Sequence, residues 1–380
     1  MSEARAFSAI PLSLPAAGTR IGRRSLFLSA CSREPCGVET FTRTLVEALA
    51  QSDPQGRYTL GAVSGRWRDV PELLRRIAQA DRVVFGFPLV AWKRLLAIPL
   101  LLLLCAKVMG RPVTTFAHEW TGMNRLRRLV LAPYLLFSRD IVVLSPLIVY
   151  QIASDPLLLR AARRCRLVPH PPTICPPEDR ALTEMVRTVE RAARGTDLVV
   201  GQFGALYQGK ASMALLEVCD HLRGRGIRAL MVFVGSFTPS LDGFETKFRA
   251  RVRELALEDQ VIVTGYVGAA EEVFALFERI GVFLFLFPEG LTARRSSVIT
   301  CLQSNRPVVV SAPLSRDEFA HHPGLSALID AGALSFVPRA ASAAEIADSL
   351  LAAAGGQRHD FPIDGKAWWD ATTTATRLAL

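Results

Sequence analysis

The chain has few cysteines, and none of them forms a CxxC pair. The seven cysteines are scattered over 380 residues, and the closest two, Cys31 and Cys36, have no histidine cluster beside them. Zinc sites and disulfide frameworks depend on paired spacings that are missing here. The sequence therefore predicts reduced thiols in a cytosolic protein, with no protein-bound metal and no other cofactor.

Long hydrophobic runs are also absent. Residues 1–24 mix Pro, Ala, Ser and Arg without the apolar core of a signal peptide, and we interpret them as a disordered lead-in. The longest apolar run, LLAIPLLLLLCAKVM at residues 95–109, is 15 residues long, whereas crossing a bilayer requires about 20. We interpret this run as a buried helix, with a helix lying in a membrane surface as the alternative.

Acidic residues are scarce relative to basic ones. The chain has 35 Asp and Glu against 45 Lys and Arg, which gives a net charge of +10 and a pI near 9.7. Such a balance suits nucleic acid, an anionic membrane or a phosphorylated substrate. No zinc-finger or RNP-like pattern occurs and aromatics do not interleave with the basic clusters, so nucleic acid is disfavoured.

Half of the chain is hydrophobic, which is enough for two domains of about 150 residues each. Short apolar runs alternate with segments of helical spacing and no short repeat is evident, so we predict doubly wound α/β domains rather than a solenoid. The predicted strands lie at residues 25–30, 82–85, 113–116, 141–144 and 167–168, and then at 197–203, 229–234, 261–264, 282–287 and 308–311.

Residues 169–196 combine a proline cluster with a charged segment, which is a linker composition. We therefore expect one Rossmann-like domain at residues 25–175 and a second at residues 197–352. Residues 353–380 form a tail that we expect to pack back on the N-terminal domain, with Trp368 and Trp369 as anchors.

Two polar loops follow predicted strands of the N-terminal half, where open α/β sheets bind ligands. The first contains Gly37 and precedes a helix predicted at residues 40–51, whose N-terminus would favour an anion. An ordinary strand–helix turn is the alternative. The second places His118 after the strand at residues 113–116, where it could exchange a proton or donate to a hydroxyl. A structural histidine is the alternative there.

Two further loops follow strands of the C-terminal half. FGALYQGK, at residues 203–210, places Lys210 after two glycines at a helix start, which suits a phosphate, and a solvated surface lysine is the alternative. FPEGLTARRSSVITCLQSNRPVVVS, at residues 287–311, predicts a βαβ unit with a polar loop at the carboxyl edge of a parallel sheet. In that loop Glu289 could accept from hydroxyls, while Arg294 and Arg295 offer forked donors to phosphate oxygens. A solvated charge pair on a helix is the alternative.

These motifs, together with VFVGS and VIVTGYV, stand in the order of a known family. Over roughly residues 25–350 the chain resembles the retaining, nucleotide-sugar-dependent glycosyltransferases of family 4, of the group 1 type. The resemblance implies the GT-B fold, an α/β architecture of two Rossmann-like domains whose parallel sheets face across a cleft. It also implies that the N-terminal domain binds the acceptor and the C-terminal domain the nucleotide sugar.

The resemblance implies roles for the loop residues. Glu289 would contact hydroxyls of the donor sugar and His118 would lie close to that sugar, and these two would be the catalytic residues. The implied donor diphosphate-binding residues are Gly37, Lys210, Arg294 and Arg295, and the implied nucleotide- or sugar-binding residues are Gly204, Gly290, Ser296 and Ser297.

Several positions depart from the family pattern. Ser297 stands where a second glutamate usually holds the ribose, and Ala205 stands where an arginine is usual. Cys36 and Ala211 each replace a usual glycine. These departures shift phosphate binding onto Lys210, Arg294 and Arg295.

The implied reaction is transfer of a sugar from a nucleoside-diphosphate sugar to a saccharide or lipid-linked acceptor, without a metal, in exopolysaccharide or cell-envelope synthesis. No pair of carboxylates stands at hydrolase-like positions, which disfavours glycoside hydrolysis. A non-catalytic GT-B protein that binds a nucleotide sugar or a partner enzyme is the main alternative, and a GT-B sugar epimerase is a further one.

The basic residues Arg125, Arg127 and Arg128 adjoin the apolar LVLAPYLLF. This pattern indicates a cytoplasmic protein in peripheral contact with an anionic membrane. An amphipathic helix packed on its own domain is the alternative.

Overall fold

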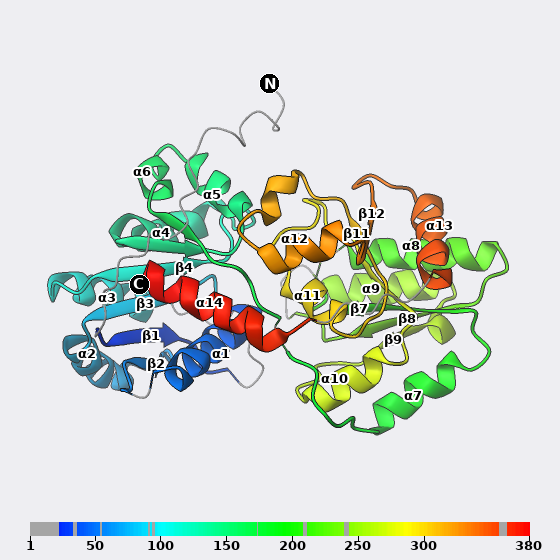
Figure 1. Ribbon diagram of the computed structural model, residues 1–380, viewed down its shortest axis with the longest axis horizontal. Helices are drawn as coiled ribbons and strands as arrows, with labels where there is room; N and C mark the ends of the chain where they lie inside the picture. Colours follow the sequence, from blue (N-terminus) through cyan, green and yellow to red (C-terminus); the bar gives the residue numbers. More distant parts are fainter. Residues whose placement is uncertain are drawn as a thin grey trace. The chain divides into compact units, whose positions relative to one another are not determined.

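The protein, seen here as a computed structural model, forms two compact units (Figure 1). The structure describes residues 23–32, 36–53, 55–89, 92, 96–172, 174–207, 211–238, 243–356 and 363–380. All but the last two residues of the predicted lead-in lie outside these ranges. Unit 1 comprises Met1–Pro171, Asp317–His322 and Lys366–Leu380, and unit 2 comprises Pro172–Arg316 and Pro323–Gly365.

Unit 1 is built on a six-stranded parallel sheet of order β2-β1-β3-β4-β5-β6. Its central strands are buried on both faces, which explains why they are mostly apolar. The strands are β1 (Ser25–Ser29), β2 (Tyr58–Ala62), β3 (Arg82–Phe87), β4 (Val113–Ala117), β5 (Asp140–Val143) and β6 (Cys165–Leu167).

Helices cover both faces of the unit 1 sheet, and alternate strand residues supply the two cores. Phe27 and Val84 face α1 and α14, and Leu28 and Phe85 face the opposite group. The red helix α14 lies beside the first strands in Figure 1, and its Trp369 stacks on Phe41 of α1 at 6.2 Å. The helices of unit 1 are α1 (Gly37–Gln51), α2 (Val70–Gln79), α3 (Ala97–Val108), α4 (Arg125–Phe137), α5 (Pro146–Ala153), α6 (Leu159–Ala162) and α14 (Gly365–Ala379), with the 3-10 turn η2 (Trp67–Asp69).

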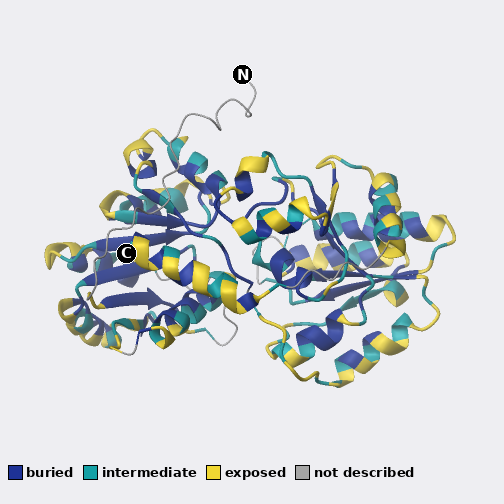
Figure 2. Ribbon diagram, in the orientation of Figure 1, coloured by how far each residue is buried: buried dark blue, intermediate teal, exposed yellow. Residues whose placement is uncertain are grey.

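Unit 2 repeats this plan with a sheet of order β12-β11-β10-β7-β8-β9, again all parallel. Phe277 of α10 packs edge-on against Phe283 of β10 at 4.9 Å, on one face of the sheet. Figure 2 shows the central strands of both sheets as buried. The strands are β7 (Leu198–Phe203), β8 (Ala229–Val234), β9 (Val261–Val263), β10 (Val282–Phe285), β11 (Val308–Ser311) and β12 (Leu334–Val337).

The opposite face of the unit 2 sheet is covered by α8, α9 and α13. The helices of this unit are α7 (Glu184–Ala193), α8 (Ser212–Gly224), α9 (Phe244–Glu254), α10 (Ala270–Phe277), α11 (Ser296–Leu302), α12 (Pro323–Asp330) and α13 (Ala343–Gly355), with the 3-10 turn η4 (Glu258–Gln260). The 3-10 turn η5 (Arg316–Phe319) spans a boundary between the units. Arg316 belongs to unit 2, and the segment Asp317–His322 that follows belongs to unit 1.

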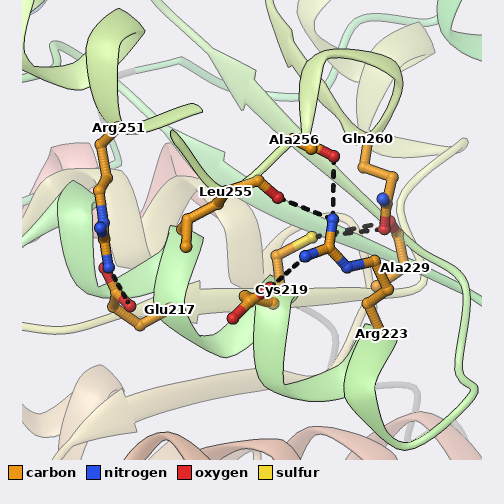
Figure 3. Close-up of polar contacts among 9 residues, drawn as sticks. Glu217, Cys219, Arg223, Ala229, Arg251, Leu255, Ala256 and Gln260 are labelled. Atoms are coloured by element: carbon orange, nitrogen blue, oxygen red, sulfur yellow. Dashed lines mark hydrogen bonds and ion pairs between the residues drawn. The ribbon is translucent and has the colours of Figure 1, made fainter. Parts of the chain in front are cut away.

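A network of polar side chains joins α8 to the end of α9 (Figure 3). Arg251 donates to both carboxylate oxygens of Glu217, at 2.8 and 2.9 Å. It also donates to Glu254 at 2.9 Å. Arg223 donates to the carbonyls of Leu255 and Ala256, at 2.7 and 2.9 Å. Leu255 and Ala256 directly follow α9, so Arg223 ties α8 to the C-terminal end of that helix. We call this network the α8–α9 brace.

The apolar run at residues 95–109 forms α3, which is buried on one side only. Ile98, Leu102 and Leu103 face the core, whereas Leu104 and Val108 are exposed. The prediction of a buried helix is therefore wrong for its outer face. No helix within the described residues combines the length and apolarity needed to cross a bilayer.

The predicted strands all occur, with ends that differ by one to two residues for most of them. The sequence did not predict β2 or β12. The linker expected at residues 169–196 contains helix α7, which belongs to unit 2. Helix α1 begins at Gly37 rather than at residue 40, so residues 37–39, which were expected in the loop, form its first turn.

Candidate functional site

The loop between β10 and α11 brings the predicted glutamate and both arginines of unit 2 together. Glu289 Oε1 accepts from Arg294 Nη2 at 3.0 Å and also forms an ion pair with Arg295 Nη2. β10 and β11 are parallel neighbours, so this loop lies at the carboxyl edge of the sheet, as the βαβ pattern predicted. We call the three side chains the Glu289 cluster, and they present one carboxylate against two guanidinium groups.

Arg295 is held by contacts beyond its ion pair. Its guanidinium carbon lies 4.3 Å from the ring centroid of Phe287, and its Nη1 donates to the hydroxyl of Tyr207 at 3.3 Å. Its side chain is only 10% exposed. A cation stacked on an aromatic face and bonded on both nitrogens of its fork has a fixed orientation.

Burial and charge act in opposite directions on this cluster. Burial disfavours the charged carboxylate, but the adjacent Arg295 and Arg294 guanidinium groups outweigh it, so the pKa of Glu289 lies below its ordinary value. Burial also disfavours the charged form of Arg295, yet Tyr207 and Glu289 more than offset it and raise its pKa. Glu289 and Arg295 are therefore both ionised at neutral pH.

Gly290 shapes the loop that carries the cluster. Its φ of +77° lies in the left-handed region, and a Cβ at this position would lie 2.2 Å from the carbonyl oxygen of Ala312. Only glycine meets both conditions without a backbone shift. The geometry thus gives Gly290 a structural role, and its predicted contact with the donor stays a prediction.

The loop after β7 runs beside the loop after β8. The amide of Leu206 donates to Ser236 O at 2.9 Å, and a Cβ on Gly235 would lie 2.3 Å from Gly204 O. Gly235 therefore permits the close packing of these two loops, and Gly204, with φ of +99°, has a backbone conformation that favours glycine. This packing also positions Tyr207 against Arg295. Residues 208–210, and with them the predicted phosphate ligand Lys210, lie outside the described residues.

Ala211 begins α8 in the left-handed conformation, with φ of +47°. An alanine Cβ is strained there, whereas glycine is not. This backbone explains why a glycine is the expected residue at this position.

Ser296 and Ser297, the predicted nucleotide- or sugar-binding residues, form the first turn of α11. Both are partly exposed and follow Arg295, which is the N-cap residue. The helix has only 7 residues, so the arginine side chains rather than a helix dipole are its main source of positive potential.

In unit 1, Gly37 is the first residue of α1, and no atom lies within 4 Å of a Cβ built on it. The first turn also contains Glu39, which is fully buried and accepts from the amide of Ser32 at 2.6 Å. A diphosphate at this terminus would approach the Glu39 carboxylate. The structure therefore gives less support to an anion at Gly37 than at the Glu289 cluster.

His118 directly follows β4, at the carboxyl edge of the unit 1 sheet. The His118 ring lies edge-on to the ring of Phe41 in α1, with the centroids 5.3 Å apart. The same Phe41 ring also contacts His170 edge-on, with the centroids 5.1 Å apart. Burial, with a smaller contribution from His118, lowers the pKa of His170 to about 3. His170 is therefore neutral and structural at neutral pH, while His118 stays partly exposed.

Two residues of the site were not predicted. Tyr207 lies within the FGALYQGK motif, so the loop was identified but its contact with Arg295 was not. Phe287 was interpreted only as the end of a strand. Within the part of the chain that the structure describes, no group of three or more His, Cys, Asp or Glu side chains is arranged to hold a metal ion.

No protein-family model matches the chain, and no curated protein matches it by sequence. Solved structures do match it over almost its whole length. HepE from Anabaena, crystallised with UDP-glucose, is 12% identical, covers 94% of each chain and has a TM-score of 0.62. A glycosyltransferase from Rickettsia africae is 11% identical with a TM-score of 0.56, covering 94% of this chain and 93% of its own.

WaaG, a glycosyltransferase involved in lipopolysaccharide biosynthesis, is 15% identical, with a TM-score of 0.56 over 92% of this chain and 94% of its own. At such identities the likeness shows the fold alone. The chain has the GT-B fold, with two six-stranded, all-parallel sheets and interleaved helices. The predicted fold class is confirmed.

Proposed function

We propose that this protein is a retaining glycosyltransferase that transfers a sugar from a nucleoside-diphosphate sugar. The observation that carries the proposal is the Glu289 cluster, a partly buried pair of arginines held by one carboxylate at the carboxyl edge of the second sheet. Open α/β sheets bind ligands at that edge. The GT-B fold, which HepE shares in its complex with UDP-glucose, supports the choice of donor class.

The leaving group of such a donor is a diphosphate, whose negative charge grows as the glycosidic bond breaks. Arg295 is already oriented by Phe287 and Tyr207, so it needs little rearrangement to stabilise that charge. Arg294 and Lys210 complete the proposed phosphate site, and no metal is assigned to it. Removing one preorganised donor of this kind costs about 3 kcal/mol in the barrier.

In this proposal Glu289 pairs first with the two arginines and then, once a donor is bound, with hydroxyls of the donor sugar. Without a donor, its carboxylate neutralises part of the charge of Arg294 and Arg295. When a diphosphate takes over the arginines, the carboxylate becomes available to accept from hydroxyls of the donor sugar.

The acceptor is assigned to unit 1, where His118 and Gly37 lie at the carboxyl edge of the first sheet. We propose a saccharide or lipid-linked acceptor, in exopolysaccharide or cell-envelope synthesis at the cytoplasmic face of a membrane. His118 is proposed to lie near the donor sugar. Gly204, Gly290, Ser296 and Ser297 are proposed to contact the nucleotide or sugar.

A panel of nucleotide sugars tests the donor class. The true donor should raise the thermal unfolding temperature by mass action, and it should be slowly hydrolysed in the absence of an acceptor. Both signals should weaken in Lys210→Ala and Arg294→Ala. Binding without any turnover would instead favour a non-catalytic nucleotide-sugar-binding protein, an alternative to which Ser297 lends support. A panel in which no nucleotide sugar stabilises the protein would overturn the proposal.

A further inference from the structure

The positive charge of the chain is concentrated in one part of unit 1. Residues 88–171 contain twelve Lys and Arg but only three Asp and Glu, which accounts for +9 of the net charge of +10. These residues form α3, α4, α5 and α6 together with the strands between them. The rest of the chain is therefore almost neutral, and any long-range attraction to an anionic partner acts through this region.

Helix α4 in this region is apolar on two opposite sides. Leu131, Tyr134 and Leu135 are buried against the sheet. Leu126 and Leu129 are 72% and 67% exposed, and Leu136 and Phe137 are also exposed. At 3.6 residues per turn these four exposed residues fall within a sector about 100° wide, opposite the buried side. One side of α4 thus packs against the core of unit 1, and the other side is exposed.

The neighbouring helices extend this apolar surface. α3, α4 and α6 all contribute to the core on the same face of the unit 1 sheet. Arg164, just after α6, donates to the carbonyls of Leu135 and Leu136 at the end of α4, at 3.0 and 3.2 Å. α6 is exposed along its outer side (Figure 2).

Of the fourteen large hydrophobic residues exposed in the described part of the chain, nine belong to these helices and their ends, which marks the surface as more than ordinary scatter. The nine are Leu104, Val108, Met109, Leu126, Leu129, Leu136, Phe137, Leu157 and Leu159.

Cations flank these apolar residues. Arg125, Arg160 and Arg163 are exposed, and among the described residues none of them forms an ion pair with an acid. Arg127, in contrast, is turned inward and donates to Leu89 O at 3.3 Å. Of the three arginines that the sequence suggested for this surface, Arg127 is therefore not available to a partner.

We propose that α4, with the exposed ends of α3 and α6, docks in the headgroup region of an anionic lipid bilayer. Its leucines and Phe137 would enter the boundary of the acyl chains, and the flanking arginines would contact lipid phosphates. This helical face combines apolar residues with a margin of charges that are all positive. Such a face suits an anionic lipid surface better than a protein partner that carries charges of both signs. The helix lies on the bilayer and does not cross it.

The role of this docking surface rests on the proposed function, because docking would bring the enzyme to a lipid-linked acceptor. Vesicle binding is measured without donor or turnover, so the two proposals fail separately. Flotation of the full chain with vesicles of phosphatidylcholine alone, and of phosphatidylcholine with phosphatidylglycerol, provides the test. We expect binding to the anionic vesicles and a decrease at high salt, because salt screens exposed charges. Absence of binding to anionic vesicles at low salt overturns the proposal.

The variant Leu126→Ser/Leu129→Ser should reduce vesicle partitioning by at least about tenfold, since each leucine loses most of its transfer free energy. The matched control is Leu182→Ser/Tyr266→Ser, which changes two exposed apolar residues of unit 2. It should bind as the parent does. Circular dichroism checks that both variants are folded, and Arg125→Gln/Arg160→Gln/Arg163→Gln should bind less while remaining folded. Equal losses in the test and control variants contradict the proposal, as does a dimer that Leu126→Ser/Leu129→Ser dissociates in the absence of lipid.

Discussion

Unit 2 contains two arginine–glutamate networks of opposite character. The Glu289 cluster has one carboxylate for two arginines, and Arg295 is almost completely buried. The α8–α9 brace has two carboxylates, Glu217 and Glu254, around Arg251. Its residues are at the surface, and Glu254 is 62% exposed.

The contrast separates a binding site from a helix support. Exposed ion pairs are screened by water and salt, so the brace needs no particular charge ratio to be tolerated. In the Glu289 cluster two guanidinium groups are largely shielded from water, so they would interact more strongly with a nearby anion than exposed arginines do. The Glu289 cluster also lies at the carboxyl edge of the sheet, whereas the brace joins two helices on the opposite face. The cluster is therefore the place where an anionic ligand is expected.

The largest effect should come from Arg295→Ala. Loss of a preorganised donor to the leaving diphosphate should reduce kcat by about 10²–10³. Arg295→Lys should recover only part of this, because lysine keeps the charge but loses the fork and the stacking on Phe287. Steady-state kinetics with the donor found in the panel provides the measurement.

The control for Arg295→Ala is Arg251→Ala, which removes the central arginine of the brace. It should lower the thermal unfolding temperature slightly and leave kcat unchanged. Similar kinetic losses in both variants would mean that the two networks do not differ in function.

Glu289→Gln should separate donor affinity from turnover. Without its internal carboxylate, the Glu289 cluster gains a full positive charge, so the free nucleoside diphosphate should bind about tenfold more tightly. Sugar transfer should fall, because the contact with the sugar hydroxyls is lost. Calorimetric titration with the diphosphate tests this, and Glu217→Gln should change neither quantity. Weaker diphosphate binding in Glu289→Gln would contradict the proposal that the arginines pass from the Glu289 carboxylate to the diphosphate.

The pH dependence of stability should also distinguish Glu289. Its pKa is lowered in the folded protein, so its ion pairs stabilise unit 2 fully above the ordinary pKa of glutamate, about 4.3. This contribution is lost as the pH falls through the lower folded value. The difference in unfolding free energy between the parent and Glu289→Gln should therefore shrink in that acid range. A difference that is constant with pH would mean that the carboxylate is not paired in solution.

Burial explains which parts of this fold could be predicted. Central strands such as β8 and β11 are buried on both faces and appear in the sequence as unbroken apolar runs. β2 and β12 are edge strands with exposed residues, and YTLGA and LSFV give a weaker pattern. Loops that follow strands were located for the same reason, since the strands before them were recognised.

The contacts within the site could not be predicted. Tyr207 and Arg295 are 88 residues apart and meet only because β7 and β10 are neighbours in the sheet. No local pattern encodes that pairing. The intramolecular pairing of Glu289 with both arginines likewise depends on side-chain geometry, which spacing alone does not give.

The smallest expected effect concerns two alanines, one beside each network. Ala211 follows the loop that carries Tyr207, and Ala256 ends α9 in the brace, and both have φ near +50°. An alanine in this region costs about 1–2 kcal/mol. Glycine would relieve that strain but would add about 0.4–1 kcal/mol of unfolded-state entropy.

Ala211→Gly and Ala256→Gly should therefore each stabilise unit 2 by about 0.5–1 kcal/mol, measured by chemical denaturation. Only Ala211→Gly should also change donor affinity, weakening it by about threefold, because a glycine there gives the adjacent loop more freedom to lose on binding. The strain at Ala211 would then be a cost that preorganises the loop, whereas the same strain at Ala256 would serve only to end a helix. Equal donor affinity in the two variants would show that both alanines merely shape helix ends, and the contrast would then rest on the arginines alone.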